Sequence, residues 1–306
     1  FKSVVASGAW SSTSPVLTGR RALAGAGTQT AGLINGGYTG TDMAVTEEYN
    51  GSGWSSSGNM NTARYNQFSI GTQTAAVTFS GVYSGTPVSA ATENYDGSSW
   101  TTSGSMNTAR LKPGGAGTQT AGLGFGGFNA TAAISNVETY NGTAWTSSTA
   151  LTTAQGYGYG MGTQTAALSV GGSPVATLTQ SYDGSSWTTG GSLGSGRYSL
   201  NGAGTQTSAL VMGGRLDPGG GASTAATEAY DGTSWTSQPT LAVIANSGGS
   251  AGASNTSAFF ATGTGPVDNT PTAQEYNVAT SIITPAAWAS GGSLNTARSQ
   301  VSRAGT

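Results

Sequence analysis

Residues 61–106 read NTARYNQFSIGTQTAAVTFSGVYSGTPVSAATENYDGSSWTTSGSM, and they form one copy of a unit that recurs along the chain. Four short segments of apolar, aromatic and small residues follow one another in it. They cover residues 65–70, 74–80 and 91–95 and the residues around Trp100. GTQT joins the first two segments, a glycine ends the second, and Asp96-Gly97 joins the last two. Segments this short between such turns are typical of antiparallel strands.

One tryptophan marks the same place in each copy of the unit. The seven are Trp10, Trp54, Trp100, Trp145, Trp187, Trp235 and Trp288, with steps of 44, 46, 45, 42, 48 and 53 residues. A four-stranded antiparallel meander repeated about every 45 residues is a blade of a β-propeller. Gly and Thr are too frequent for helices, so the predicted fold class is all-β.

The turn before the tryptophan carries Asn-Gly or Asp-Gly in five copies. These pairs are Asn50-Gly51, Asp96-Gly97, Asn141-Gly142, Asp183-Gly184 and Asp231-Gly232. Such dipeptides favour a two-residue type I′ hairpin, because both central residues of that turn need φ > 0. We therefore expect type I′ turns between the third and fourth strands.

The number of blades is predicted by counting two positions of the unit that occur seven times. One is the tryptophan, and the other opens the first strand. The second set is Arg20, Arg64, Arg110, Gln155, Arg197, Asn246 and Arg298. The glycine-ended second strand occurs only six times. The sequence thus predicts a seven-bladed β-propeller of four-stranded antiparallel blades, whose last blade is shared between the N- and C-termini and lacks one strand. Sharing a blade would remove free strand edges; an excerpt from a longer array is the alternative.

The prediction places the whole chain, residues 1–306, in a single propeller domain. Its blades are expected at about 17–60, 61–106, 107–150, 151–193, 194–240, 241–294, and 295–306 plus 1–16.

Composition excludes several classes of function. Only 7% of the residues are charged, the net charge is −2, and there is no Cys and no His. Phosphate-based nucleic-acid binding needs a basic patch that the chain lacks. No apolar run approaches the ~18 residues that span a membrane. Thiolate metal sites and His acid–base chemistry are absent, so we predict no cofactor, no metal and no enzyme activity.

The repeated aromatic and charged residues are interpreted as structural. A tryptophan in every blade favours packing between blades over a set of sugar-stacking platforms. Glutamates stand two residues before the third-strand tyrosine at Glu47, Glu93, Glu138 and Glu228. We expect them to form inter-blade ion pairs with the arginines that open the first strand. The alternative is a ring of arginines that holds an axial anion or ligand.

Variation between copies is the better guide to binding. The GTQT and Asp/Asn-Gly turns are nearly uniform, whereas the loops between the second and third strands differ in length and chemistry. Binding residues concentrate on loops that a rigid scaffold carries. The candidate ligand- or partner-binding residues are Tyr38, Asp42, Tyr83, Phe128, Arg215, Asp217 and Asp268.

The pattern GTQTA, Gly-Gly, TE.Y.G.SW and MNTAR resembles the kelch family over nearly the whole chain. Four copies hold the glycine pair, at residues 36–37, 126–127, 171–172 and 213–214, while the others depart from it at Ser80-Gly81 and Thr262-Gly263. The resemblance implies a propeller of four-stranded blades. Kelch-type copper enzymes need His, Tyr and a Cys–Tyr crosslink, which this chain cannot supply. The low charge and the abundance of Thr, Gly and Ser resemble kelch-like structural or adhesive proteins of phages and marine microbes.

We therefore expect a non-enzymatic propeller on a virion or cell surface, that is, an extracellular or virion location. Its variable face would contact a surface glycan, a protein partner or a neighbouring subunit. A purely structural assembly component of a virion or extracellular layer is the alternative. A glycoside hydrolase would need two carboxylates, for which Asp42, Asp217 and Asp268 are the candidates.

Overall fold

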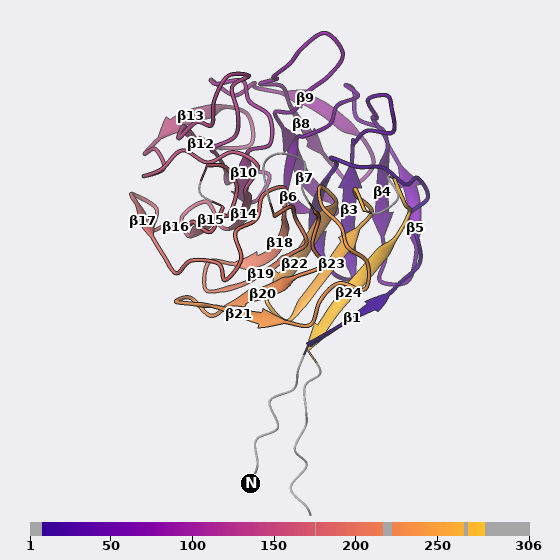
Figure 1. Cartoon of the computed structure of the whole chain (residues 1–306). Coiled ribbons are helices and arrows are strands. Elements are labelled where there is room, and N and C mark those ends of the chain that lie inside the picture. The colour runs from indigo at the N-terminus through magenta and orange to yellow at the C-terminus, as the bar shows by residue number, and fades with distance from the viewer. Residues whose placement is uncertain (1–7, 175, 217–221, 266–268, 279–306) are drawn as a thin grey trace, which may run out of the picture.

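The computed structural model describes residues 8–174, 176–216, 222–265 and 269–278, and these residues form a β-propeller of six four-stranded antiparallel blades (Figure 1). The inner strands are β2 (Ala24–Thr28), β6 (Phe68–Thr72), β10 (Gly114–Gly117), β14 (Tyr159–Gly162), β18 (Asn201–Thr205) and β22 (Gly249–Ser254). The second strands are β3 (Ala31–Asn35), β7 (Ala75–Phe79), β11 (Gly122–Phe125), β15 (Ala167–Val170), β19 (Ser208–Met212) and β23 (Ser257–Ala261).

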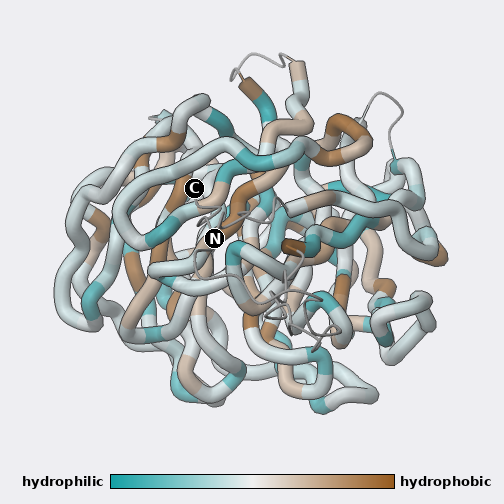
Figure 2. The backbone as a smooth tube through the Cα atoms, turned by 90° about the horizontal axis from the view of Figure 1, so that it is seen from below, coloured by the Kyte–Doolittle hydropathy of each residue, from teal (hydrophilic) through white to brown (hydrophobic). Residues whose placement is uncertain are grey.

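The third strands are β4 (Thr46–Tyr49), β8 (Thr92–Tyr95), β12 (Val137–Tyr140), β16 (Thr179–Tyr182), β20 (Thr227–Tyr230) and β24 (Ala273–Val278). The outer strands are β5 (Trp54–Ser57), β9 (Trp100–Ser103), β13 (Trp145–Ser148), β17 (Trp187–Thr189), β21 (Trp235–Gln238) and β1 (Gly8–Ser12). Blades 1 to 6 are numbered here in the order of their inner strands. Coloured by hydropathy, the backbone is pale over most of its length (Figure 2), as a chain with few charges and much Gly, Ser and Thr requires.

The predicted number of seven blades is wrong, because the N-terminal strand completes blade 6. β1 pairs with β24 in antiparallel register, with Trp10 opposite Tyr276, just as Trp54 stands opposite Tyr49 in blade 1. Figure 1 shows β1 and β24 side by side at the edge of the ring. Trp10 thus fills the outer-strand place that the sequence had given to Trp288 in the range 241–294. Trp288 and Arg298 lie outside the described residues.

The turn before each tryptophan is also different from its prediction. Tyr95 pairs with Trp100, so four residues form the loop, and Asp96 N donates to Ser99 O at 3.2 Å. Gly97 has φ +95°, but Asp96 is not in the left-handed region, so a type I′ turn is excluded. The Asp96 carboxylate instead accepts from the backbone N–H groups of Ser98 and Ser99 at 2.8 Å, the local bonding that makes Asp and Asn turn formers.

Crowding at the axis explains the small residues of the inner strands. A Cβ added to Gly160 would lie 2.2 Å from Gly115 N in the neighbouring inner strand, and one added to Gly25 would lie 2.6 Å from Ser250 N. Glycine is found where two backbones approach this closely. β6 and β14 are the exceptions, since they carry the large side chains of Phe68, Ile70, Tyr159 and Met161.

Tryptophan side chains of the described residues pack between neighbouring blades. Trp145 meets Phe79 of the preceding blade at 4.9 Å between ring centroids, and Trp187 meets Phe125 at 5.0 Å. In four blades the indole Nε1 also donates to a threonine that begins the third strand of the preceding blade. These bonds are Trp100–Thr46, Trp145–Thr92, Trp235–Thr179 and Trp10–Thr227.

The glutamine of each GTQT turn makes a second inter-blade contact, which the sequence analysis missed. Gln119 Nε2 donates to Ala76 O at 2.8 Å and to Tyr95 O at 2.7 Å, both in the preceding blade. The contact with the third-strand tyrosine carbonyl recurs around the ring. Its donors are Gln29, Gln73, Gln119, Gln164, Gln206 and Asn255. The uniform turns are therefore clamps that hold each blade to its neighbour.

A β-bulge in β22 shifts blade 6 by one residue. The register of β22 on β23 changes between Ala251 and Ser254. Gly214 N bonds to Ala245 O, as Gly172 N bonds to Arg197 O in the blade before. A bulge adds one residue to a strand, so Ala245, and not Asn246, occupies the place of the opening arginine.

Two tryptophans lack the threonine that accepts a hydrogen bond from Nε1 in the other blades, and a substitution can supply it. Within the described part of the chain, Trp187 and Trp54 have buried Nε1 groups without a hydrogen-bond partner, because Val137 and Ala273 replace threonine opposite them. We expect Val137→Thr to raise the free energy of unfolding by about 0.5–1.5 kcal/mol, since it supplies an acceptor. Thr92→Val should lower it by about 1–3 kcal/mol, since it strips Trp145 of its acceptor. Urea unfolding of both variants checks the pair, and equal shifts in one direction would contradict it.

The closure of blade 6 can be tested by a disulfide in a chain that has no cysteine. Ala9 and Asn277 are register partners and both are exposed, and cross-strand partners have Cα separations that a disulfide can bridge. We expect Ala9→Cys/Asn277→Cys to form an intramolecular crosslink on mild oxidation. The control pair Ala9→Cys/Ser55→Cys, with its second cysteine in blade 1, should remain reduced. Non-reducing electrophoresis distinguishes the two, and crosslinking of the control alone would refute this closure.

Candidate binding groove

The two faces of the ring carry different kinds of connection. The clamping turns and the Asp/Asn-Gly loops lie on one face, because both follow strands that run toward it. The loops between second and third strands lie on the opposite face together with the connections that enter each blade, and we call it the loop face. Backbone bridges tie these loops to the entering connections, as between Arg21 and Tyr38 or Leu111 and Phe128.

Buried ion pairs hold the loops of the loop face in place. Arg110 Nη1 donates to Gly126 O at 3.0 Å and Asn136 O at 2.8 Å, which are the two ends of one loop. Its Nη2 contacts Glu138 Oε1 at 2.5 Å. Burial lowers the pKa of Arg110, and the charge of Glu138 partly offsets this effect. Removing either partner would leave an uncompensated charge in the interior.

The same pair recurs in four blades, within each blade. The pairs are Arg20–Glu47, Arg64–Glu93, Arg110–Glu138 and Arg197–Glu228. Each glutamate lies on the third strand of the blade that its arginine opens, so the expectation of inter-blade pairs is wrong. The glutamates also bind the entering connection: Glu138 accepts from the N–H groups of Asn107 at 2.6 Å and Thr108 at 3.2 Å.

Neutral residues occupy this place in the other two blades. In blade 4, Gln180 Nε2 donates to Gln155 Oε1 at 2.5 Å, and Gln155 Nε2 contacts Gly171 O. In blade 6, Gln274 takes the place of the glutamate and Ala245 that of the arginine, and Gln274 Oε1 accepts from Ala242 N at 2.7 Å. The fold therefore accepts a neutral amide pair where charge is removed from both partners.

Three tyrosines and one carboxylate converge in a groove on the loop face between blades 1 and 2. The groove encloses about 580 Å³ and is lined by Tyr38, Asp42, Tyr65 and Tyr83; we call these four residues the tyrosine groove. A second hollow of about 340 Å³ continues past Tyr83 toward Pro87. Such an open, partly aromatic surface can hold a flat, polar ligand several groups long.

Local geometry sets the direction of each side chain in the groove. Tyr38 follows Gly36 and Gly37, whose φ values of +64° and +114° turn the chain out of β3. Its backbone bridges to Arg21 on one side and to Asp42 on the other. Tyr65 stands on the entering connection and bridges to Val82, which brings Tyr83 beside it.

The tyrosine rings are ordered by contacts with one another and with a cation. The Tyr38 and Tyr65 rings lie 5.0 Å apart at 47°, and the Arg21 guanidinium carbon lies 5.4 Å from the Tyr38 ring centroid. Burial raises the pKa of Tyr65, and the charge of Asp42 adds to this rise. The Tyr65 hydroxyl therefore stays protonated as a donor, while the Asp42 carboxylate can accept from ligand hydroxyls.

The structure brings together three of the residues that the sequence singled out, Tyr38, Asp42 and Tyr83, and adds Tyr65. Phe128 lies outside the groove, and its ring packs against that of Tyr157 with the centroids 4.9 Å apart and the planes tilted by 53°. Arg215 belongs to blade 5, across the ring from blade 2, and bridges to Tyr198 and Ser223. The other two candidates, Asp217 and Asp268, lie outside the described residues. The variation between loops does not identify Tyr65, because this residue follows the repeated NTAR motif and lies outside the variable loops.

Comparison with family models matches no protein family, and comparison with curated proteins finds no similar sequence. Within the described ranges, no three His, Cys, Asp or Glu side chains gather to form a metal site. The same ranges contain no helix that could cross a membrane.

The ion pairs can be tested by neutralising one partner or both, because blade 4 already holds a neutral pair of glutamines in this place. We expect Glu93→Gln to lower the free energy of unfolding by about 3–5 kcal/mol, since Arg64 would remain buried and unpaired. The double variant Arg64→Gln/Glu93→Gln should recover a large part of that loss. Denaturant unfolding of the wild type, both single variants and the double variant gives the coupling energy. A double variant as unstable as the sum of the singles would contradict this view of the pair.

Proposed function

We propose that this protein is a non-enzymatic binding propeller of the kelch-like type, which holds a neutral glycan in the tyrosine groove. The observation that carries the proposal is the convergence of Tyr38, Tyr65 and Tyr83 around Asp42 on the variable face. Aromatic rings offer flat apolar surface with a polar rim, which suits the faces of a sugar ring. The carboxylate and the phenol groups suit its hydroxyls.

The closed ring and the low charge of the molecule support the same proposal. A closed ring with clamped blades presents the groove without needing to reorganise, and a preorganised site loses less entropy when it binds. With a net charge of −2 and 7% charged residues, recognition would depend on hydroxyl, amide and bridging-water contacts. We place such a protein at an extracellular or virion surface, where glycans are displayed.

Hydrolysis of the bound glycan is the less favoured function. Glycosidases position two carboxylates on opposite sides of the bond that they cleave. Asp42 is the one carboxylate among the described residues that line the groove. We therefore propose binding without turnover.

A structural role in a larger assembly is the second candidate, and it has an observation of its own. A hollow of about 250 Å³ in blade 6 is lined by Pro15, Val243 and Pro271, and Ile244 beside it is 42% exposed. Exposed apolar surface of this kind marks contacts with other proteins. A neighbouring subunit could cover this hollow while the tyrosine groove stays open.

The glycan proposal is tested by removing the groove aromatics one at a time. Tyr38→Ala and Tyr83→Ala should each weaken binding by about 1–2 kcal/mol, or about 5- to 30-fold. Binding would be measured by calorimetry, with a neutral oligosaccharide selected from an array of gluco-, galacto- and manno-configured chains. Phe128→Ala is the matched control, because Phe128 holds the Tyr38 position in blade 3 and lies outside the groove.

Two results would refute the proposal. One is the absence of saturable binding to any neutral oligosaccharide, which would favour the assembly role. The other is an equal loss of affinity in Phe128→Ala and in Tyr38→Ala, which would move the site away from the groove.

A further inference from the structure

The axis of the propeller is blocked by one tyrosine side chain. Tyr159 of β14 reaches across the axis, where its hydroxyl donates to Ser250 O of β22 at 3.1 Å and lies 3.2 Å from Ser250 Oγ. Its ring packs 5.1 Å from Phe68 of β6. The inner strands of blades 2, 4 and 6 thus meet at one point. This plug divides the axis into one pocket on the loop face and one on the face of the clamping turns.

Above the plug, six backbone groups form a hydrogen-bonded ring around the axis. Each residue donates its N–H to the carbonyl of the equivalent residue in the preceding blade. The bonds are Asn66–Ala22, Lys112–Asn66, Tyr157–Lys112, Ser199–Tyr157, Ser247–Ser199 and Ala22–Ser247, at 2.7–3.3 Å. All six residues have φ between +47° and +61°, and none is glycine. Because this conformation recurs in all six blades, the backbone ring belongs to the scaffold, and only the side chains that it carries differ from blade to blade.

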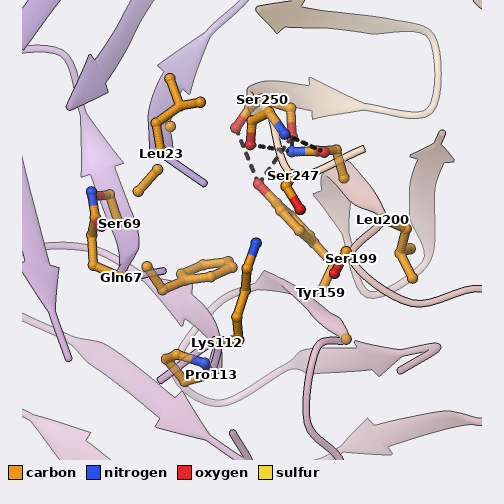
Figure 3. Close-up of a pocket in the computed structure, with 16 residues that line it drawn as sticks. Leu23, Gln67, Ser69, Lys112, Pro113, Tyr159, Ser199, Leu200, Ser247 and Ser250 are labelled. Atoms are coloured by element: carbon orange, nitrogen blue, oxygen red, sulfur yellow. Dashed lines mark hydrogen bonds between the residues drawn. The ribbon is translucent and has the colours of Figure 1, made fainter. Parts of the chain in front are cut away.

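The ring carries a single charge, and that charge points into the axial pocket. Figure 3 shows the Lys112 side chain extending into the pocket, toward Tyr159 and Ser247. Among the described residues, the Lys112 ammonium has no ion pair and no carboxylate lines the pocket. The Lys112 side chain is half-buried, and a partly desolvated ammonium without a counter-charge is costly. The site is therefore electrostatically incomplete.

The other polar side chains that line the pocket are neutral, and they alternate with apolar ones such as Leu23 and Leu200. Ser69, Ser199, Ser247 and Ser250 surround the pocket, and Gln67 Oε1 is buried without a hydrogen-bond partner among the residues that the structure describes. The space open to a small molecule is about 30 Å³, and ~10–15 Å³ is enough for one water molecule. The pocket can therefore hold one group of two or three heavy atoms, next to the ammonium.

We propose that the axial pocket binds a small carboxylate, with Lys112 Nζ as its ionic partner and the serine hydroxyls of the ring as hydrogen-bond donors. Formate has the required size and charge. The carboxylate of a larger ligand could enter in the same way, with the rest of that ligand lying on the loop face. The axial pocket and the tyrosine groove share no lining residue. The carboxylate proposal and the glycan proposal can therefore be refuted independently.

The charge of Lys112 makes the affinity of the pocket for a carboxylate depend on pH. Burial lowers the pKa of Lys112 to about 8, so the amino group is protonated at neutral pH and loses its proton as the pH rises through that value. Tyr159 is the other titratable side chain among the residues that line the pocket, and burial raises its pKa to about 12, so it stays neutral. Carboxylate affinity should therefore fall between pH 7 and pH 9 with the charge of Lys112.

The test uses the full chain, sodium formate and two Lys112 variants. Lys112→Asn and Lys112→Ala place residues that already occupy the ring at Asn66 and Ala22, so the left-handed backbone is accommodated. In the wild type at pH 7, formate should give saturable broadening of its own ¹³C resonance and a saturable rise of at least about 2 °C in unfolding temperature. Both effects should disappear in the two variants, and Arg215→Ala, which removes a cation away from the axis, should keep them.

When formate is absent, the Lys112 variants should be more stable than the wild type. Removal of a half-buried charge that has no counter-charge in the pocket should raise the unfolding temperature of Lys112→Asn above that of the wild type in anion-poor buffer. Equal formate effects in the wild type and Lys112→Asn, or no saturable effect at pH 7, would overturn the proposal. If neither variant folds, retention of full formate affinity at pH 9.5 in the wild type would overturn it.

A second arm identifies the source of the carboxylate. Glucuronate and galacturonate are titrated in parallel with formate. Tighter binding of either sugar acid, lost in Lys112→Asn, would assign the pocket to the acidic end of a larger ligand. Binding of formate alone, also lost in Lys112→Asn, would assign it to a free small anion.

Discussion

The pairing of the N-terminal strand Gly8–Ser12 with Ala273–Val278 is the constraint on which the rest of the structure depends. It turns a row of blades into a ring, so that blade 6 has its full four strands and its tryptophan. Once the ring is closed, each blade has two neighbours, so that Gln29 of blade 1 binds the Tyr276 carbonyl of blade 6 and Trp10 of blade 6 binds Thr227 of blade 5. The same closure brings six inner strands to one axis, which makes glycine necessary at the closest approaches and creates the axial pocket.

The repeat unit was predictable from the sequence because its strands and turns are short and locally coded. GTQT, the third-strand tyrosine and the tryptophan recur at fixed offsets, and these fix a four-stranded blade. The number of blades was not predictable in the same way. Trp10 and Trp288 look alike in sequence, and only the long-range pairing of Trp10 with Tyr276 shows which strand completes blade 6. The bulge that moves Ala245 into the arginine position is likewise a tertiary adjustment that no spacing reveals.

The candidate groove was predictable in part, because loop variation identified Tyr38, Asp42 and Tyr83. Their convergence depends on the order of blades 1 and 2 around the ring, and so does the inclusion of Tyr65. Lys112 gave a weaker signal. It is one of two lysines in 306 residues, but its meaning depends on a left-handed backbone ring and on a tyrosine from another blade, neither of which is encoded near it in the chain.

The repeat offers its own standard for separating structural from functional residues. A residue type that recurs in most blades, such as the clamping glutamine, serves the interface that every blade shares. Replacements that keep the contact, such as Gln155 with Gln180 in place of an ion pair, show that the contact matters more than its charge. Tyr159 and Lys112 are different. Lys112 is the one charged residue of the backbone ring, and Tyr159 is the inner-strand residue whose hydroxyl reaches Ser250 across the axis. Because a sixfold scaffold does not require either one, their presence at the axis is best explained by an occupant of the pocket that they build.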